Sequence, residues 1–425
     1  APEHELPSYL EKVQSQLPAL HLVMQMGWQY LPPEETVELR NNRLGAVILE
    51  PILVDHIRNH CRYEFKGAAQ PFTENAIQNA VQTLKSFRAT GALHQNEQIY
   101  DLLCLGTSVP QTVEGDTKSF TIDYIDWKKP ANNTYHCTAE FKVERVGYDK
   151  HYIPDIVLFV NGIPLVVIEC KRSAYTRIKK KPVELAVDQL SDYQSRDGIP
   201  QLFLYSQLLL VLARDKARYG TTGTLRQFWA AWQEDRIDEP IRKLLETPLS
   251  QMDMDLMLSG PFADVRNDFR KILDLGREIY QQDRALYALC RPERLLELAY
   301  KFILFDNGTK KIARYQQYFT VHDIMNRVLS EHEHSTGPRP GGVVWHTQGS
   351  GKSLTMVMLA KSLALHPAIV DPKIILVTDR IDLDDQICGT FRACSLEPEQ
   401  ANTCLLYTSP SPRDELADLV CRLRL

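Results

Sequence analysis

The charged residues with the most informative spacing are Asp155, Glu169 and Lys171, which bracket two apolar runs in P-D-I-V-L-F-V-N-G-I-P-L-V-V-I-E-C-K. Asn161 and Gly162 lie between the runs, and both residue types tolerate positive φ, so the segment predicts a β-hairpin. A hairpin brings its two outer ends side by side, and residues two apart on a strand share a face. The pattern therefore predicts that two carboxylates and one amine gather at one end of a hairpin.

The register of this hairpin decides which side chains meet. A strict two-residue turn would pair Asp155 with Ile168 and direct Glu169 to the opposite face of the sheet. A three-residue loop or a one-residue bulge would instead pair Asp155 with Glu169. Pro164 has no N–H to give to a strand ladder, which favours an irregularity close to the turn. We predict the offset register.

Neighbouring carboxylates suit Mg²⁺, a hard cation that takes oxygen ligands and keeps several waters. A cation held by Asp155 and Glu169 would polarise a scissile phosphate and lower the pKa of the attacking water. Lys171 would orient that water and offset the charge of the phosphorane. We interpret these three residues as the catalytic set of a metal-dependent nuclease, with Asp155 and Glu169 as the metal ligands.

This pattern resembles the PD-(D/E)xK nuclease superfamily. Gln189 and Tyr193 follow on an expected helix over 183–196, and their i, i+4 spacing places them on one helical face. They are similar to the Q-x-x-x-Y element of the branch that includes RecB-like nucleases and type I restriction subunits. The resemblance implies that both residues act in the catalytic site by positioning the lysine or the DNA.

The same branch usually adds an acidic residue from an early helix. Glu50 is our candidate, because it lies in the apolar helical pattern G-A-V-I-L-E-P-I-L-V, where a lone carboxylate needs a partner. Glu38 and Glu74 are the alternatives.

A basic run follows the nuclease motif directly, between residues 172 and 181. The whole chain has 49 Lys and Arg against 54 Asp and Glu, a formal net charge of −5. Because affinity for DNA comes largely from neutralised phosphates, DNA must be bound through local basic patches rather than through the whole surface. We therefore predict DNA binding by Arg172, Lys179, Lys180 and Lys181.

A second chemical motif is the glycine-rich stretch V-V-W-H-T-Q-G-S-G-K-S-L-T-M, which lies between an apolar run and a helical pattern. An expected strand, a glycine loop and a helix in this order are the context of a phosphate-binding loop. Backbone N–H groups would bind the phosphates of ATP, the lysine would reach the β- and γ-phosphates, and the following serine would hold Mg²⁺. The predicted nucleotide-binding residues of the loop are Gly349, Ser350, Gly351, Lys352 and Ser353, with Ser353 as a metal ligand.

The surroundings of this loop resemble superfamily 2 helicases. His346 replaces the first glycine of the general motif, and that position is relaxed in these helicases. R-Y-Q-Q-Y-F at 314–319 resembles their glutamine motif, which reads adenine, with Gln317 as the better-aligned glutamine. I-I-L-V-T-D-R-I-D-L-D-D-Q-I at 374–387 looks like motif Ia, and the resemblance implies DNA contacts by three further residues, Asp379, Arg380 and Gln386.

The chain as a whole reads as an α/β protein of several domains. Its first hundred residues favour helices, short β-branched and aromatic runs follow from residue 119, and a charged, leucine-rich helical stretch separates the two motifs. From about Cys404 the tail resembles translated sequencing-adapter read-through. We predict a PD-(D/E)xK endonuclease domain at 1–235, a helical connector at 236–300, a partial RecA-like P-loop lobe at 301–403 and a non-native tail at 404–425.

This order of motifs resembles the restriction (R) subunit of type I restriction–modification enzymes, over about residues 1 to 400. V-N-G-I-P-L-V-V-I-E-C-K, D-N-G-T-K-K-I-A-R-Y-Q-Q-Y and V-T-D-R-I-D-L-D-D-Q are its most specific stretches. The resemblance implies a Mg²⁺-dependent endonuclease and ATP-dependent translocase that acts on double-stranded DNA. It implies modification (methyltransferase) and specificity subunits as partners. A RecB-like repair nuclease–helicase and a non-catalytic assembly module are the alternatives.

Two parts that such a motor needs are not found in the sequence: a D-E-x-x box for hydrolysis and a second RecA-like lobe. The stretch D-E-L-A at 414–417 mimics the box but follows S-P-S-P-R rather than a buried strand. We therefore expect a truncated chain that binds ATP without turning it over.

Composition excludes several other classes of protein. The chain is 44% hydrophobic and 24% charged, with no apolar run long enough to cross a bilayer and no visible signal peptide. Its nine cysteines include no C-x-x-C pair, so a zinc site is not expected. These features predict a cytoplasmic globular protein that does not contact a membrane.

Overall fold

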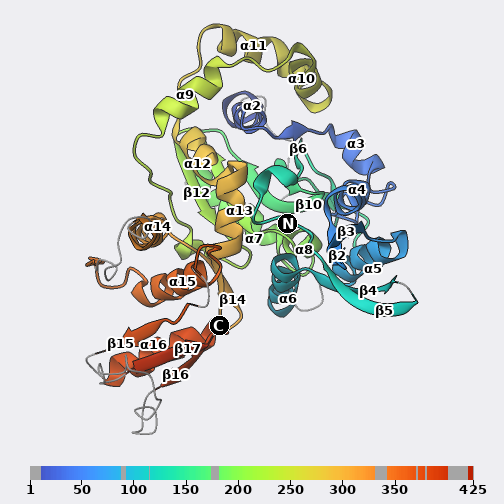
Figure 1. Cartoon of the computed structure of the whole chain (residues 1–425). Helices are drawn as coiled ribbons and strands as arrows, with labels where there is room; N and C mark the ends of the chain where they lie inside the picture. The colour runs from blue at the N-terminus through green and yellow to red at the C-terminus, as the bar shows by residue number, and fades with distance from the viewer. Residues whose placement is uncertain are drawn as a thin grey trace. The chain divides into compact units, whose positions relative to one another are not determined.

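A computed structural model describes residues 11–87, 92–113, 115–173, 181–330, 342–369, 372–378, 381–400 and 420–424. The chain forms two compact units, Ala1–Tyr300 and Lys301–Leu425 (Figure 1). This boundary differs from the one expected near residue 235, because the connector packs on the N-terminal part of the first unit. Its helix α12 (Gln281–Cys290) contacts α2 (Leu17–Gln25), and Trp28 Nε1 donates to Cys290 O at 3.0 Å.

The first unit is built on a six-stranded sheet that mixes parallel and antiparallel pairs. Its strands β9, β10 and β11 are buried at every position, and such continuous apolar runs are typical of strands covered on both faces. Helix α7 (Pro182–Tyr193) packs on β10, β11 and β12 and lies in the crossover that the parallel pair β10–β11 requires. The sheet order is β1 (Gln29–Tyr30), β6 (Tyr135–Ala139), β9 (Ile156–Val160), β10 (Ile163–Cys170), β11 (Leu208–Ala213) and β12 (Lys216–Gly220).

The hairpin β9–β10 has the predicted offset register. A bulge follows Pro164, and beyond it Ile168 pairs with Ile156. One residue further along, this register sets Asp155 opposite Glu169. The irregularity next to the proline therefore does what the sequence predicted: it directs both carboxylates to the same face of the sheet.

The turn of this hairpin is as tight as the Asn-Gly pair indicates. Asn161 and Gly162 have φ values of 52° and 78°, the two positive values that a type I′ turn needs. A side chain at Gly162 would also collide with the main chain, because its Cβ would lie 2.4 Å from Leu49 O. The turn end of the hairpin is thus packed against the residues that precede α4 (Glu50–His60).

Short helices and hairpins surround the sheet of the first unit. The helical character expected for the first hundred residues is confirmed by η1 with α2, by α4 and by α5. The π-helical turn η1 (Lys12–Gln16) leads directly into α2. The other elements are α3 (Pro33–Glu38), β2 (Arg62–Phe65), β3 (Ala68–Pro71), α5 (Glu74–Lys85), α6 (Ala92–Leu105), β4 (Thr107–Val113), β5 (Asp116–Ile122), η2 (Pro130–Asn132), β7 (Val143–Glu144), β8 (His151–Tyr152), α8 (Pro200–Phe203), η3 (Arg226–Phe228), α9 (Asp238–Glu246), α10 (Gln251–Met257), η4 (Gly260–Val265), α11 (Arg266–Asp274) and α13 (Pro292–Lys301).

In its described residues, the second unit combines a small hairpin, three helices and a three-stranded antiparallel sheet in the order β15-β17-β16. Helix α15 packs on α14 and on α16. The elements are β13 (Ile303–Asp306), β14 (Thr309–Ile312), α14 (Tyr315–Ser330), α15 (Lys352–Ala364), β15 (Ile375–Val377), α16 (Ile381–Ala393), β16 (Glu397–Gln400) and β17 (Val420–Arg424).

One expectation for this unit differs from the structure. Residues 342–347 form no strand, and Val343 and Trp345 are 93% and 91% exposed, because no neighbouring layer among the described residues covers them. Within the stretch expected to be a non-native tail, residues 420–424 form β17, which pairs with β15 and β16. In the described part of the chain, no helix combines the length and the apolar character that crossing a bilayer requires.

Candidate active site

The structure brings Asp155, Glu169 and Lys171 together at the outer end of the β9–β10 hairpin. Their exposed fractions are 5%, 0% and 9%. Lys171 Nζ donates to Glu169 Oε1 at 2.8 Å, and Asp155 Oδ2 accepts the Cys170 main-chain N–H at 2.6 Å. The strand end, the bulge and one main-chain hydrogen bond therefore fix a buried set of two carboxylates and one ammonium group.

A third carboxylate, which the sequence analysis missed, joins this set. Glu11 precedes the π-turn η1 and is 6% exposed. Its Oε1 lies 3.6 Å from Lys171 Nζ, and its Oε2 accepts the Arg172 main-chain N–H at 3.3 Å. The resemblance did call for an acidic residue from an early helix. Glu11 meets this requirement by its position, because it lies at the start of the first helical segment.

Glu50, the predicted early acid, does not join the cluster. It forms an ion pair with Lys85 at the start of α4. Leu49, its neighbour, donates its N–H to Gly162 O at 2.8 Å, so Glu50 lies near the turn of the hairpin and Asp155 lies at the other end. Six residues of extended chain separate these ends by about 20 Å. The two alternatives, Glu38 and Glu74, are both exposed, and Glu74 pairs with Arg58.

Burial and mutual repulsion control the charge state of the carboxylates. Burial raises the pKa of Asp155 well above its usual value, and the neighbouring Glu169 raises it further. Burial also raises the pKa of Glu169, although Lys171 opposes this effect. For Lys171, burial lowers the pKa, but the three carboxylates outweigh it and the net pKa is raised. The lysine is thus held charged, while the carboxylates need either a proton or a cation.

The carboxylate oxygens fit a divalent cation. Glu169 Oε2 is buried and has no hydrogen-bond partner, a costly state that a bound cation would relieve. Within the described residues, no group of three or more His, Cys, Asp or Glu side chains is arranged to hold a metal ion. Asp155 and Glu169 would therefore hold the cation together with water or substrate oxygens, which is the coordination that Mg²⁺ tolerates well.

Gln189 and Tyr193 lie on helix α7, and Tyr193 Oη donates to Ile153 O, two residues before Asp155, at 3.4 Å. Gln189 Nε2 donates to Tyr193 Oη at 2.6 Å, and Tyr193 is 1% exposed. Burial raises the pKa of Tyr193, and so do the nearby carboxylates of Glu169 and Asp155. Tyr193 is therefore near enough to the two carboxylates for their charges to act on its hydroxyl group, and Gln189 is bonded to that hydroxyl.

The π-turn η1 contacts the same end of the sheet, an arrangement that no sequence pattern predicted. Gln16 is fully buried, and its Nε2 donates to Asp155 O at 3.2 Å. Ser173 Oγ donates to Gln14 Oε1 at 3.4 Å. π-helical turns occur often at functional sites, and here the turn directs several side chains onto the strand ends that hold the charged cluster.

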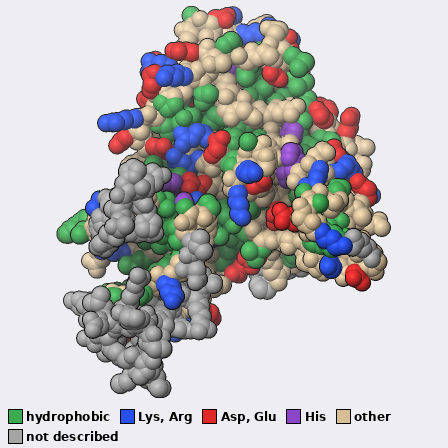
Figure 2. Space-filling view, viewed as in Figure 1, with side chains coloured by type: hydrophobic (Ala, Val, Ile, Leu, Met, Phe, Trp, Pro, Cys, Tyr) green, Lys and Arg blue, Asp and Glu red, His purple; other side chains and the backbone are tan. Residues whose placement is uncertain are grey.

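The predicted DNA-binding residues can be placed only in part. Arg172 is half-buried beside Glu11, and Lys181 is exposed at the start of α7. Gln386 is exposed on α16 in the second unit. Lysines 179 and 180, together with Asp379 and Arg380, lie outside the described residues. On the face shown in Figure 2, basic side chains are interspersed with acidic ones, as the near-balanced charge predicts.

In the second unit, the glycine loop has the backbone of a phosphate-binding turn. Gly349 and Gly351 have φ values of 76° and 83°, and α15 begins directly at Lys352. Lys352 is exposed and Ser353 is half-buried. Such a helix start directs N–H groups and the positive end of the helix dipole toward an anion.

Two side chains from α14 hold this loop. Gln317 is 4% exposed, and its Nε2 donates to Gly351 O at 3.2 Å. The ring of His346 lies between Thr320 Oγ1, at 2.9 Å from Nε2, and Ser350 Oγ, at 3.2 Å from Nδ1. The structure therefore places the predicted glutamine against the loop and gives the histidine at the first-glycine position a definite set of contacts.

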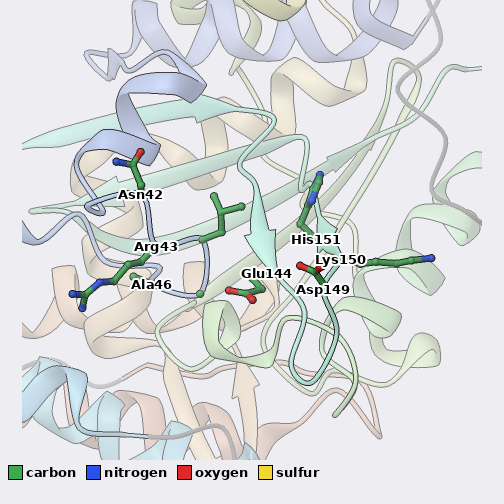
Figure 3. A pocket seen from close by; sticks show the side chains of 9 residues that line it. Asn42, Arg43, Ala46, Glu144, Asp149, Lys150 and His151 are labelled. Atoms are coloured by element: carbon green, nitrogen blue, oxygen red, sulfur yellow. The ribbon is translucent and has the colours of Figure 1, made fainter.

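A separate cavity of about 620 Å³ opens between the loop 42–46 and the β7–β8 hairpin. None of the predicted site residues lines it. In Figure 3 the side chains of Arg43 and Lys150 point in opposite directions, so they do not converge on an anion, and Glu144 and Asp149 carry the opposing charge. This cavity is therefore separate from the strand-end cluster and from the glycine loop.

Two family models match the chain, one within each unit. The family model "Type I restriction enzyme R protein N terminus" matches residues 8–228, and a model described as "SWI2/SNF2 ATPase" matches residues 316–408. The first match covers more than half of the chain, and the chain belongs to this family. The resemblance to the N-terminal part of the R subunit is thereby confirmed.

Individual relatives carry the same description. The type I restriction enzyme HindI endonuclease subunit of Haemophilus influenzae is 27% identical over 387 residues, which are 88% of this chain and 32% of the relative. The MjaIXP endonuclease subunit of Methanocaldococcus jannaschii is 27% identical over 308 residues, 72% of this chain and 27% of the relative. The chain thus spans less than a third of the length of each of these two relatives.

Proposed function

We propose that the first unit is a Mg²⁺-dependent endonuclease that hydrolyses phosphodiester bonds of double-stranded DNA. The observation that carries this proposal is the offset register of β9–β10, which sets Asp155 opposite Glu169 while Lys171 donates to Glu169 at 2.8 Å. An accidental group of strand-end charges would lie in solvent. This group is buried at a cost in free energy, and buried, mutually perturbed charges are more typical of functional sites than of incidental strand ends.

The residues divide the chemistry among them. Hydrolysis forms one P–O bond from water and breaks the bond to one sugar oxygen, which takes up a proton as the water loses one. Mg²⁺ held by Asp155 and Glu169 would supply the charge that polarises the phosphate. Lys171, kept charged by its carboxylate neighbours, would orient the water and face the charge that develops on phosphorus. The Gln189–Tyr193 pair would position the lysine or the DNA strand.

We propose that the second unit is the first part of an ATP-driven motor lobe. The SWI2/SNF2 ATPase match over 316–408 supports this, as does the contact between Gln317 and Gly351. Lys352 and Ser353 would bind the phosphates and their Mg²⁺. In this proposal the chain is part of a type I restriction enzyme that cuts unmodified foreign DNA. It would assemble with modification and specificity subunits and translocate DNA with ATP.

A plasmid-nicking assay on the full chain tests the nuclease proposal. Wild type with Mg²⁺ should convert supercoiled plasmid to nicked circles, and Asp155→Ala should slow this by about 100-fold or more, since a metal-held phosphate contributes several kcal/mol. Glu50→Ala is the matched control and should nick at the wild-type rate. Equal nicking by wild type and Asp155→Ala would refute the proposal and would favour a non-catalytic assembly module.

A further inference from the structure

The N-terminal segment from Glu11 to Trp28 lies between the connector and the active site, and it contacts both. Toward the active site, Glu11 reaches Lys171 and the Arg172 main chain, and Gln16 reaches the Asp155 main chain. These contacts come from the single turn η1 and its first flanking residue. The position of η1 therefore decides where the third carboxylate lies.

Toward the connector, the same turn makes a reciprocal pair of buried hydrogen bonds. Ser15 Oγ donates to Gln282 Oε1 at 3.1 Å, and Gln282 Nε2 donates to Ser15 O at 3.4 Å. Both residues are 0% exposed. Gln282 is itself fixed, because its main-chain N–H donates to Arg214 O, next to the end of β11, at 3.1 Å.

Further hydrogen bonds join the N-terminal segment to the connector on either side of this pair. Lys12 Nζ donates to Pro261 O at 2.7 Å, and Arg277 Nη1 donates to Pro18 O at 2.9 Å. The segment is thus tied to residues 261–282 before, within and after the turn that covers the active site.

The polar character of the Ser15–Gln282 pair indicates a positioning role. A buried Ser–Gln pair adds little stability over an apolar pair of similar shape, but it fixes the relative position of two segments, because every misplaced polar atom would lose its partner. Ser15 faces the connector, while Gln16, the next residue, faces the strand end. A shift of α12 would consequently move the residues that face Asp155 and Lys171.

We propose that Gln282 is a positioning residue of the nuclease centre, which acts through Ser15 and η1 to hold Glu11 against Lys171. This rests on the proposed nuclease function only for its activity readout. The connector then helps to position the nuclease centre, in addition to joining the two units of the chain.

Hydrogen exchange on the full chain tests the positioning without any need for activity. Gln282→Leu should speed exchange at the Arg172 amide, whose N–H bonds to Glu11, by about fivefold, the effect of weakening one hydrogen bond of about 1 kcal/mol. Exchange in β11, at residues 208–213 of the same sheet, should not change. Gln281→Leu makes the same chemical change one residue earlier on α12 and should leave both peptides unchanged.

A double variant separates positioning from stability. Ser15→Ala and Gln282→Leu should each raise the Mg²⁺ concentration for half-maximal nicking by about tenfold or more and leave the KM for DNA unchanged, as loss of an outer contact to a metal site does. Combined, they should have no larger effect than either alone, because both remove the same link. A variant that keeps the wild-type thermal midpoint but needs more Mg²⁺ for nicking would support a positioning role rather than a loss of stability.

Three results would overturn the inference: unchanged Arg172 exchange in Gln282→Leu, equal acceleration in β11, or an unchanged Mg²⁺ requirement in a variant chain that nicks DNA. A wild-type chain with no Asp155-dependent nicking would instead refute the proposed function. In that case the exchange comparison alone would decide whether Gln282 positions Glu11.

Discussion

The carboxylate of Asp155 accepts the main-chain N–H of Cys170 at 2.6 Å, so the end of β9 is tied to the end of β10 between Glu169 and Lys171. This bond continues the strand pairing beyond the last ladder position through a side chain. It holds one carboxylate oxygen of Asp155 in place. The hairpin itself therefore holds Asp155, Glu169 and Lys171 together.

The raised pKa of Asp155 predicts that its charged carboxylate destabilises the folded chain when no cation is bound. Burial and Glu169 raise this pKa in the folded state above its usual value of 3.8. The free energy of unfolding should therefore fall as the pH rises from about 4 through the raised pKa, because the folded chain then has to carry the costly charge. Asp155→Asn removes that charge and can keep the bond to Cys170. In EDTA it should raise the thermal midpoint by about 2–4 °C for each kcal/mol relieved.

Thermal unfolding of wild type and Asp155→Asn at pH 5 and pH 8 measures this effect. The advantage of the variant should grow with pH, and saturating Mg²⁺ should stabilise wild type but not the variant. A variant that is less stable than wild type at both pH values would contradict the prediction.

Glu11→Gln tests the acidic residue that the structure adds to the cluster. The Lys171 ammonium loses one of three carboxylate neighbours, so the nicking rate should fall by about 10- to 100-fold, as for other outer contacts of a metal site. Glu50→Gln is the matched control, because Glu50 pairs with Lys85 near the hairpin turn. The reverse ranking of the two variants in the plasmid assay would show that Glu50, not Glu11, serves the centre.

Much of this centre could be predicted from local sequence, because its main parts lie within one hairpin. The Asn161-Gly162 turn, the buried runs and the proline together predicted the register. Glu11 could not be chosen in the same way. Its contact with Lys171 depends on how η1 packs against a strand that lies far away in the sequence.

Contacts between segments that are far apart in the sequence also explain two other differences from the predicted fold. The connector joined the first unit because Gln282 and Cys290 bond to residues near the N-terminus, contacts that no periodic pattern reports. The run V-V-W predicted a strand by composition, but Trp345 is exposed, and strand formation requires neighbouring elements to cover the apolar side chains. Local sequence patterns thus predicted where most helices and strands form, while packing between distant segments determined which of them contact one another.

Buried histidines predict that the first unit loses stability in mild acid. Burial, and then Arg277, lowers the pKa of His21 from 6.5 to about 3, and burial lowers that of His56 to about 4. Both side chains are 3% exposed. In the unfolded chain the two histidines bind protons at a higher pH than in the folded chain. Their contribution to the free energy of unfolding is therefore fully present above pH 6.5 and is lost as the pH falls toward these values. Each histidine should contribute a slope of up to about 1.4 kcal/mol per pH unit.

Urea unfolding at intervals from pH 7 to pH 4.5 measures this slope, and His21→Gln should reduce it. Glutamine has a similar size and does not titrate. A slope that is identical in wild type and in the variant would show that His21 takes up its proton without unfolding.

The histidine in the glycine loop predicts a specific defect in nucleotide binding. His346→Ala removes contacts to Thr320 and Ser350, which hold the loop from both sides, and two hydrogen bonds of about 1 kcal/mol each correspond to an ATP affinity that is about 10- to 30-fold weaker. Lys352→Ala should abolish binding, because the residue supplies the charge at the exposed start of α15. His366→Ala, beyond the end of α15, is the control and should bind as wild type does. Calorimetric titration with ATP and Mg²⁺ distinguishes these outcomes, and an unchanged affinity in His346→Ala would show that the loop holds its shape without the ring.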